Sequence, residues 1–474
     1  MLSPIKQIQL WFASLTAYEK RSLQLAIVLT IVTRLIFVIA ALTHHPVALE
    51  VDTYRYLAIA NEPGFARWFD LNDPAGYPIL LKLTGTTLTS YAGILILQAL
   101  LSTATIVLLF IAGREILGQK WNRLMVILAA LSLLSMFFSS QLMTETSFCF
   151  FFVLATVILL KSAGLEKHKL LLFIGGLSLS FATLVRPSSV VTIVILVPLL
   201  LYYVYARKIS FANATSFILG LLLLVSLYAT GLKIKYNYFG ISVKGPTTLS
   251  IYYGIPIMQS AGYSDHFIDS TIGALPTSEQ YLDHNRADHI DGDTFAHKHN
   301  ALFLQLLKEH PIDVLRVHFL GIAQMLTWPP AGLFQLSKHF GALPSDAPLQ
   351  EMDFQTIFGS LVRLKLGRVY ETLNERLALA PLFVQFIWIV ATLFWIVLFP
   401  FAIFGLVLMT VDTFMKRLPF QYALFLGVIL SYIFLIPHVA AGARFRMPIE
   451  PFLILCAVYT LQWLYQFSLR LESK

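Results

Sequence analysis

Apolar residues along this chain fall into long, separate runs, and most runs have the length of a membrane-crossing helix. The hydrocarbon core of a bilayer needs about 20 consecutive apolar residues in α-helical form. Such runs predict spans over 24–43, 91–111, 124–139, 146–161, 170–185, 188–205, 213–232, 382–410, 419–437 and 447–467. The pattern therefore predicts an all-α polytopic membrane protein with roughly 10–11 transmembrane helices.

One further apolar stretch, 314–334, can be interpreted in two ways. Trp328-Pro329-Pro330 interrupts it, and proline breaks a helix interior because it has no N–H to donate. We favour an interfacial or re-entrant helix here, because the other ten spans already place both termini on the same side of the membrane. If the stretch does cross the membrane, the bundle gains one span.

Two polar segments divide the chain. Loop 44–76 follows the first span, and a short half-buried helix is expected to begin at Gly76. A longer polar segment, 233–380, separates the seventh and eighth spans. We therefore expect an N-terminal transmembrane module (1–232), an extracytoplasmic or interfacial loop region and a C-terminal transmembrane module (381–474).

Composition agrees with this class. The 474 residues are 57% hydrophobic and 13% charged, whereas soluble domains carry about 25% charged residues. Lys and Arg gather in 1–23 and in the short loops that lie on the same side as the N-terminus. Basic residues collect on cytoplasmic loops, so both termini are predicted to be cytoplasmic. The net charge of +8 is explained by this bias and does not indicate a nucleic-acid partner.

This topology puts loop 44–76 on the extracytoplasmic face, where it carries Asp52 and Arg55 three residues apart. Glu145, in the next outer loop, is the second acid beside a span on that face. Charges next to a membrane are costly, so they are functional candidates. The alternatives are structural: Asp52 begins a short predicted helix and can cap it, and Glu145 can be a solvated loop acid.

Basic residues gather on the same predicted face. Arg186 ends one span, Arg444 and Arg446 begin another, and Lys82 follows the first outer loop. Arginine binds phosphate through paired hydrogen bonds and stays charged, so this group fits a lipid phosphate or diphosphate headgroup. Ordinary snorkelling at the membrane interface is the alternative.

Arg34 is almost the only charge in the middle of a predicted span. A buried charge needs a partner or a water-filled path. It is therefore either half of a structural ion pair or part of a substrate channel.

A His- and Asp-rich patch, 283–299, contains residue types that bind metals. Its histidines include His289, His297 and His299. Their spacing matches neither an EF-hand loop nor a zinc signature. A solvated loop is the favoured interpretation, and the metal remains a weaker alternative.

Five short motifs, in order along the chain, resemble the GT-C superfamily of glycosyltransferases that use polyprenyl-phosphate sugars. They are Asp52-Thr53-Tyr54-Arg55-Tyr56, Asp73-Pro74-Ala75-Gly76-Tyr77-Pro78, Met143-Thr144-Glu145-Thr146, Leu184-Val185-Arg186-Pro187 and Arg444-Phe445-Arg446-Met447-Pro448. The likeness is greatest to the branch with bacterial protein O-mannosyltransferase-like and lipid A aminoarabinose transferase-like enzymes. It covers 24–210 and 430–465. The chain departs from the family at Ala75, where a second proline is usual, and in having no second acid beside Asp52.

The resemblance implies a GT-C-like bundle in a bacterial inner (plasma) membrane, with its active site on the extracytoplasmic face. The donor would be a polyprenyl-phosphate sugar, for example one on undecaprenyl phosphate, used in cell-envelope glycan biosynthesis. The acceptor would be a lipid, a glycan or a protein. Divalent metal is used by some relatives and stays open here.

The resemblance also implies residue roles for an inverting transfer. Asp52 would be the catalytic base and Glu145 would orient the acceptor or share that duty. Four arginines would hold the donor phosphate: Arg55, Arg186, Arg444 and Arg446. Further residues are candidates to line the substrate cavity: Tyr54, Asp73, Tyr77, Lys82 and Arg34.

Two other functions compete with this hypothesis. A lipid or sugar transporter would need charged residues along a path through the bilayer and repeats between its halves, and the polar residues here cluster on one predicted face. A polysaccharide polymerase or ligase using diphosphate-linked glycans would place its key residues in the large outer loop. His289, His297 and His299 keep that second alternative open.

Overall fold

The computed structural model describes residues 12–44, 51–63, 68–162, 168–277, 291–327, 333–340, 380–415, 418–436 and 443–472. Within these ranges the chain is built of helices and contains no β-strand. Every structural statement below concerns these residues.

Seven helices are long and apolar enough to cross a membrane. They are α2 (Ala17–Thr43), α5 (Ala92–Ile116), α8 (Glu145–Ser162), α10 (Val190–Tyr205) with the short turn η1 (Pro187–Ser189) before it, α11 (Phe211–Tyr236), α21 (Leu382–Phe414) and α23 (Glu450–Glu472). Two shorter apolar helices, α9 (Lys169–Val185) and α22 (Gln421–Leu435), join them. The predicted class, an all-α polytopic membrane protein, is confirmed.

The predicted span over 124–139 is two helices, α6 (Gln119–Ala130) and α7 (Leu133–Phe138). Ser132 lies between them with extended backbone, and its side chain accepts a hydrogen bond from the N–H of Ser135. A serine in this position caps the second helix and so separates it from the first. The apolar run in the sequence continues across the break, which is why hydropathy does not reveal it.

Small residues let the α9 and α11 backbones approach closely. A Cβ atom added at Gly176 would lie 2.0 Å from the carbonyl oxygen of Phe217, and one at Gly220 would lie 2.1 Å from that of Phe173. Helices in membranes associate largely through such close packing. This close packing fixes the position of α9 relative to α11.

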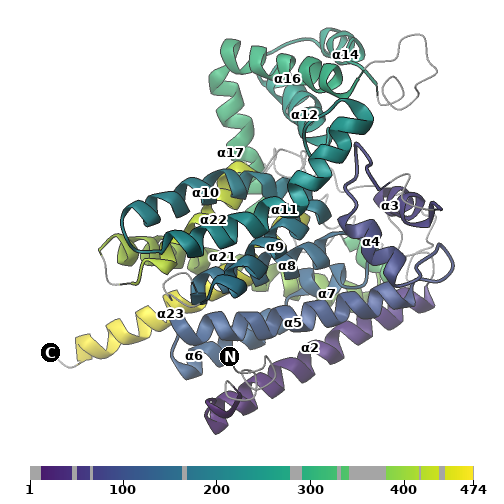
Figure 1. Ribbon diagram of the computed structural model, residues 1–474. Coiled ribbons are helices and arrows are strands. Elements are labelled where there is room, and N and C mark those ends of the chain that lie inside the picture. The colour runs from purple at the N-terminus through teal and green to yellow at the C-terminus, as the bar shows by residue number, and fades with distance from the viewer. Residues whose placement is uncertain are drawn as a thin grey trace.

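The bundle has two distinct ends (Figure 1). The short helices α3 (Val51–Asn61) and α4 (Gly76–Leu83) lie at one end, which we call the α3 end. The start of α2 and the end of α23 lie toward the other end, where Arg114 pairs with Glu19 at 2.9 Å and Lys161 with Glu115 at 2.5 Å. The start of α4 at Gly76 agrees with the sequence prediction.

The segment expected to be a polar loop is largely helical where the structure describes it. Apart from α18 (Leu333–His339), which packs against α2 and α21, its described parts form α12 (Lys244–Thr247), the π-helical turn η2 (Thr248–Tyr253), α13 (Gly254–Ser260), α14 (Asp265–Gly273), α16 (Gly292–Glu309) and α17 (Pro311–Thr327). These helices share a small apolar core of their own around Tyr253, Ile257 and Leu306. Figure 1 shows them projecting from the bundle as a group, which we call the helical cap.

The last helix of the cap, α17, connects it to the membrane bundle. The indole N–H of Trp395 in α21 donates to the carbonyl oxygen of Leu326 at 2.6 Å. Arg446 donates to the carbonyl oxygens of Met325 and Leu326, both at 3.3 Å. A cation at a helix C-terminus also interacts favourably with the helix dipole. Of the ambiguous stretch 314–334, residues 328–332 lie outside the described ranges.

Candidate active site

Helix α3 carries the first pair of candidate residues, and its inner face is anchored to the bundle. The buried hydroxyl of Thr53 donates to the carbonyl oxygen of Leu142 at 2.9 Å. The ring of Tyr56 packs edge-on against Tyr77, with centroids 5.3 Å apart. With this face held, the side chains of Asp52, Tyr54 and Arg55 stay accessible on the other side of α3.

The anchor continues into the bundle through Tyr77, which is fully buried. Its hydroxyl donates to Oε1 of Gln98 in α5 at 2.8 Å. The amide of Gln98 donates in turn to the carbonyl oxygen of Gln141 at 2.7 Å. A chain of buried hydrogen bonds of this kind specifies one arrangement, because each unpaired polar group would be costly.

Asp52 lies between two guanidinium groups. It pairs with Arg55, one turn later on α3. Its other carboxylate oxygen lies 3.3 Å from Nη2 of Arg444, which belongs to the short turn η3 (Ala443–Phe445). The first outer loop and the start of the last helix, far apart in sequence, therefore meet at this carboxylate.

The same two arginines extend the contact to further acids. Nε of Arg444 lies 2.9 Å from Oε1 of Glu145, the first residue of α8. That oxygen also accepts from Nη1 of Arg186, the C-cap residue of α9, at 2.6 Å. Nε of Arg55 lies 3.2 Å from Oδ2 of Asp73 in the loop before α4.

Asp73 pairs in addition with Lys244, the first residue of α12 in the helical cap. Seven side chains thus form one alternating ion-pair network: Arg186, Glu145, Arg444, Asp52, Arg55, Asp73 and Lys244. With four bases and three acids, the network carries a formal charge of +1. It lies at the α3 end of the bundle.

The network runs from the bundle interior to an accessible surface. Glu145 is fully buried, and the Arg186 side chain is 9% exposed. Exposure rises to 24% at Asp52, 36% at Arg444 and 48% at Arg55. The buried end is therefore fixed by its partners, while a ligand can reach the outer end.

Electrostatics keep Asp52 ionised. Burial of this carboxyl alone would raise its pKa. The positive charges of Arg444, Lys244 and Arg55 act in the other direction and leave the pKa below its usual value. Asp52 is a carboxylate at neutral pH and can accept a proton there.

Lys244 is the residue of the network that sequence reasoning missed. It stands in the polar segment 233–380, where nothing in its spacing relates it to the first outer loop. The fold brings it there because Val243 donates from its N–H to the carbonyl oxygen of Leu71 at 2.9 Å. That backbone contact aligns the start of the cap with the loop that carries Asp73.

Arg34 and Arg446 lie apart from the network, inside the bundle. Arg34 is fully buried, and its partners are neutral: Ser102 at 3.1 Å, Ser135 at 2.9 Å, Thr33 at 2.9 Å and the carbonyl oxygen of Ala130. The expected acid partner for Arg34 is therefore not among its contacts in the described residues.

Arg446 is also fully buried and pairs with Glu450 at 2.9 Å. Its guanidinium stacks over the ring of Trp395 at 3.9 Å. The expectation that Arg34 is almost the only deep charge is wrong, because Arg446 and Glu450 are buried as well. Hydropathy placed Arg446 and Glu450 at the edge of a span. In the structure, the residues just before α23 are buried inside the bundle.

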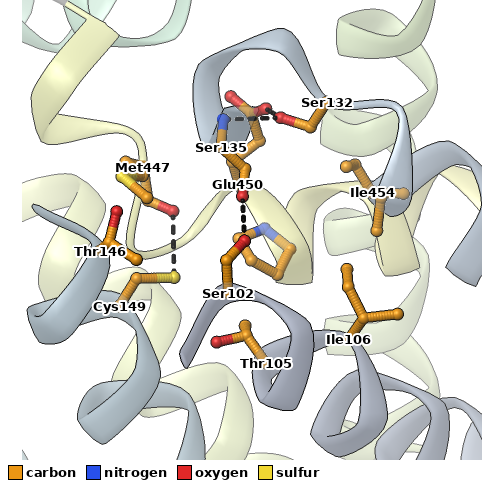
Figure 2. A pocket seen from close by; sticks show the side chains of 12 residues that line it. Ser102, Thr105, Ile106, Ser132, Ser135, Thr146, Cys149, Met447, Glu450 and Ile454 are labelled. Atoms are coloured by element: carbon orange, nitrogen blue, oxygen red, sulfur yellow. Dashed lines mark hydrogen bonds between the residues drawn. The ribbon is translucent and has the colours of Figure 1, made fainter. Parts of the chain in front are cut away.

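A small cavity lies beside Glu450 in the bundle interior (Figure 2). Ser102, Ser132, Ser135 and Glu450 are among the residues that line it in Figure 2. Its volume is about 20 Å³. A space of that size holds about one water molecule and no larger ligand. The cavity is therefore not a substrate site or a transport path in this state.

The remaining candidates occupy different surroundings. Tyr54 is 52% exposed on the outer side of α3. Lys82 donates to the backbone oxygen of Glu62 at 3.2 Å and lies 5.8 Å from the Trp68 ring centre, outside the network. Tyr77 supports α3 from behind rather than lining an open site.

The metal candidates do not converge in the part of the chain described. His289 lies outside the described ranges, and His297 is exposed on α16. His299 is buried, with one ring nitrogen 2.6 Å from Ser250 Oγ and the other 3.2 Å from the carbonyl oxygen of Pro276. Among the described residues no three His, Cys, Asp or Glu side chains are grouped as metal ligands.

The network acids do not fit a divalent cation either. Asp52, Glu145 and Asp73 are separated from one another by guanidinium groups that already pair with them. A metal site needs several carboxylate oxygens facing one point. We derive no chemical step from a metal at this site.

No protein-family model and no curated protein matches the sequence. Similar solved structures include the following two. One is an oligosaccharyltransferase from Archaeoglobus fulgidus tethered to an acceptor peptide (14% identity, TM-score 0.44), covering 96% of this chain and 50% of that one. The other is the archaeal oligosaccharyltransferase AglB from the same organism, in complex with an inhibitory peptide and a dolichol-phosphate (10% identity, TM-score 0.44), covering 95% and 50%. The chain spans about half the length of both structures.

Proposed function

We propose that this protein is an inverting glycosyltransferase that uses a polyprenyl-phosphate sugar donor at the extracytoplasmic face of a membrane. The observation that carries the proposal is the ion-pair network. Each of the five motifs that resemble the GT-C superfamily contributes at least one charged side chain to it: Asp52 and Arg55, Asp73, Glu145, Arg186, and Arg444. Five weak motifs that converge in space support a shared site more than any one of them does.

The outer cations suit a lipid phosphate. Arg55, Arg444 and Lys244 are between one third and one half exposed, and each already holds a carboxylate. A phosphodiester carries one negative charge, which matches the formal +1 of the network. On donor binding, its oxygens would replace a carboxylate as the partner of one or more of these cations. Arg186 is too buried for this and instead positions Glu145.

The cations stabilise the leaving group, polyprenyl phosphate, more than they stabilise the bound donor. When the bond between the anomeric carbon and the phosphate oxygen breaks, the phosphodiester becomes a monoester with a charge of about −1.5 to −2 at neutral pH. Fixed positive charges stabilise this developing charge more than they stabilise the bound donor. Such differential stabilisation accelerates the chemical step.

Asp52 acts as the general base. It takes the proton of the acceptor hydroxyl while that oxygen bonds to the anomeric carbon, and the electron pair of the broken bond leaves with polyprenyl phosphate. Its low pKa in the free protein makes it a weak base. Once Arg444 and Arg55 also neutralise the donor phosphate, their effect on Asp52 falls and its pKa rises toward a useful value.

The buried charges Arg34, Arg446 and Glu450 give little support to a transporter. The cavity beside Glu450 has a volume of about 20 Å³ and is too small for a transported lipid or sugar. Their hydrogen bonds join helices, as expected of a structural cluster.

The test is a donor panel with purified protein in nanodiscs. Polyprenyl-phosphate monosaccharides are supplied one at a time, with water or a candidate alcohol as acceptor, and released polyprenyl phosphate is measured by mass spectrometry. Wild type is expected to release it from at least one donor, and Asp52→Asn is expected to lose that release. Asp265→Asn, an exposed acid on α14, is the matched control for loss of one charge. Release from diphosphate-linked glycans only would favour the polymerase or ligase alternative.

A further inference from the structure

Helix α18 ends in a histidine that lies inside the bundle. His339 is fully buried, and its ring centroid is 5.3 Å from that of Phe37 in α2. Leu336, one turn earlier, packs in an apolar cluster with Phe37 and with Trp388 of α21. A polar ring in such surroundings is costly unless its nitrogens are hydrogen-bonded. The partners of His339 therefore show what the ring holds in place.

The first ring nitrogen of His339, Nε2, carries a proton. It lies 3.0 Å from the carbonyl oxygen of Phe37, which can only accept a hydrogen bond. It also lies 3.3 Å from Oγ of Ser140. The hydroxyl of Ser140 already donates to the carbonyl oxygen of Phe137 at 2.7 Å, so its oxygen accepts here. Both contacts require Nε2 to be the donor.

The second ring nitrogen, Nδ1, is an acceptor. The side-chain amide nitrogen of Gln141 lies 3.1 Å from it and donates to it. Burial lowers the pKa of the His339 imidazole to about 4, so the ring is neutral at neutral pH and Nδ1 has a free lone pair. The neutral ring thus links α2 to Gln141 through one donor and one acceptor.

Gln141 belongs to the loop 139–142, which supports both acids of the candidate site. The carbonyl oxygen of Leu142 in this loop accepts from the hydroxyl of Thr53, the residue after Asp52 on α3. Glu145, the first residue of α8, follows the loop directly. A displacement of the loop would therefore move the carboxylates of both Asp52 and Glu145.

Two side chains from different elements fix this loop. Gln98 of α5 holds its backbone, because its amide donates to the carbonyl oxygens of Ser139 at 3.3 Å and Gln141 at 2.7 Å. His339 holds the Gln141 side chain. Contacts from two directions specify one position of the loop better than either contact alone.

We propose that His339 is a positioning residue for the transfer reaction, whose neutral ring holds Gln141 and so fixes the loop that supports Asp52 and Glu145. The inference rests on the proposed function and adds a residue from α18, far from the five motifs in sequence. A displacement of 1 Å at a reacting group can cost about 10²-fold in rate. Because Gln98 still holds the loop backbone, we expect loss of the His339 contact to lower kcat by about tenfold.

Two amide substitutions separate the roles of the two ring nitrogens. In His339→Asn the side-chain oxygen takes the place of Nδ1 and still accepts from Gln141, while the contact with Phe37 is lost. In His339→Gln the amide nitrogen takes the place of Nε2 and keeps the Phe37 contact, while Gln141 loses its acceptor. Both remove the ring and should lower the unfolding temperature alike. The kcat for release of polyprenyl phosphate should stay close to wild type in His339→Asn and fall about tenfold in His339→Gln.

Hydrogen exchange gives a second measurement that needs no donor. Backbone amides in 51–61 and 139–146 should exchange faster in His339→Gln than in wild type, and as in wild type in His339→Asn. Gln141→Met removes the amide from the other side of the contact and should reproduce both effects, also where the histidine variants do not fold. His299→Gln, at a buried histidine in the helical cap, is the matched control and should leave exchange in both segments unchanged.

Two results would overturn the inference. Equal losses of kcat in His339→Asn and His339→Gln, with equal exchange, would make the ring a packing element only. Wild-type kcat and exchange in His339→Gln would mean that the Gln141 contact does not fix the loop. Failure of the proposed function looks different: wild type then releases no polyprenyl phosphate from any donor, while the exchange difference between the two variants still shows whether His339 holds the loop.

Discussion

Two groups of arginines and acids in this protein differ in what surrounds them. In the ion-pair network, Asp52, Arg444 and Arg55 keep 24%, 36% and 48% of their side chains exposed. In the bundle interior, Arg34 and Arg446 are fully buried. The first group can exchange a carboxylate partner for a substrate phosphate, and the second is enclosed by protein. Accessibility, more than residue type, separates a site for chemistry from a structural cluster.

The charge balance differs as well. Three acids share four bases in the network, and every acid contacts two cations. In the interior, Glu450 alone accompanies two guanidinium groups, and Arg34 depends on hydroxyl and carbonyl oxygens. Removing a charge should therefore affect catalysis in the first group and stability in the second.

The largest effect is expected from Asp52→Asn. A positioned base contributes about 10²–10⁴-fold to rate, so kcat should fall by that range. Asparagine keeps the size of the side chain, and the unfolding temperature should stay close to that of wild type. Initial rates and thermal unfolding of the same preparation check both. A folded variant with near-normal turnover would remove Asp52 from the mechanism.

Arg446→Ala should give the contrasting result. Breaking a buried ion pair from one side costs about 3–5 kcal/mol, because the remaining charge has no partner. Glu450 would be left unpaired, and α17 would lose a donor to its last carbonyl groups. Denaturant unfolding in detergent measures the loss. The double variant Arg446→Met with Glu450→Leu should recover much of it, and no recovery would contradict the structural role.

Lys244→Ala should weaken donor binding rather than folding. Loss of one charged hydrogen bond to phosphate corresponds to a rise in KM on the order of tenfold. Lys308→Ala, an exposed lysine on α16, is the matched control. Steady-state kinetics with one donor at varied concentration distinguishes KM from kcat. Equal KM values for both variants would place Lys244 outside the donor site.

Tyr77→Phe tests the anchor behind α3. The change removes only the hydroxyl and leaves Oε1 of Gln98 buried without its donor, which should cost about 1–3 kcal/mol of stability. Turnover should fall less than in Asp52→Asn because α3 keeps the Thr53 contact. Tyr202→Phe, on the exposed surface of α10, should have no effect. Thermal unfolding measures the stability of both variants. Equal unfolding temperatures would contradict the role of the Tyr77 hydroxyl.

The pH dependence should show the smallest change. Because neighbouring cations lower the pKa of Asp52, the acidic limb of kcat/KM should lie below 3.8, the ordinary value for aspartate. Arg444→Gln removes the largest of the lowering charges, so the limb should move to higher pH. The pairing of Asp52 also stabilises the fold above the unfolded pKa, and this contribution is lost as pH falls through the lower folded value. If the acidic limb of kcat/KM lay at the same pH in Arg444→Gln as in wild type, the limb would not report the ionisation of Asp52.

Some of this arrangement could be predicted from the sequence. Long apolar runs identified most membrane helices, and the positions of Asp52, Glu145, Arg186 and Arg444 beside spans identified most of the network. Lys244 could not be found this way, because its place depends on how the cap folds back to Leu71. The interior pair of Arg446 and Glu450 was also missed, since a buried ion pair at the start of a helix resembles an interfacial charge in sequence.

The most direct test of the difference between the ion-pair network and the buried arginines measures ligand binding without catalysis. Polyprenyl phosphate, which carries no sugar, is titrated into nanodisc-bound wild type, Arg444→Gln and Arg34→Gln, using only the folded fraction of each. Loss of one charged contact in the network should weaken binding about tenfold or more in Arg444→Gln, while Arg34→Gln should bind like wild type. Unchanged binding by Arg444→Gln together with lost binding by Arg34→Gln would move the phosphate site into the bundle and contradict the account.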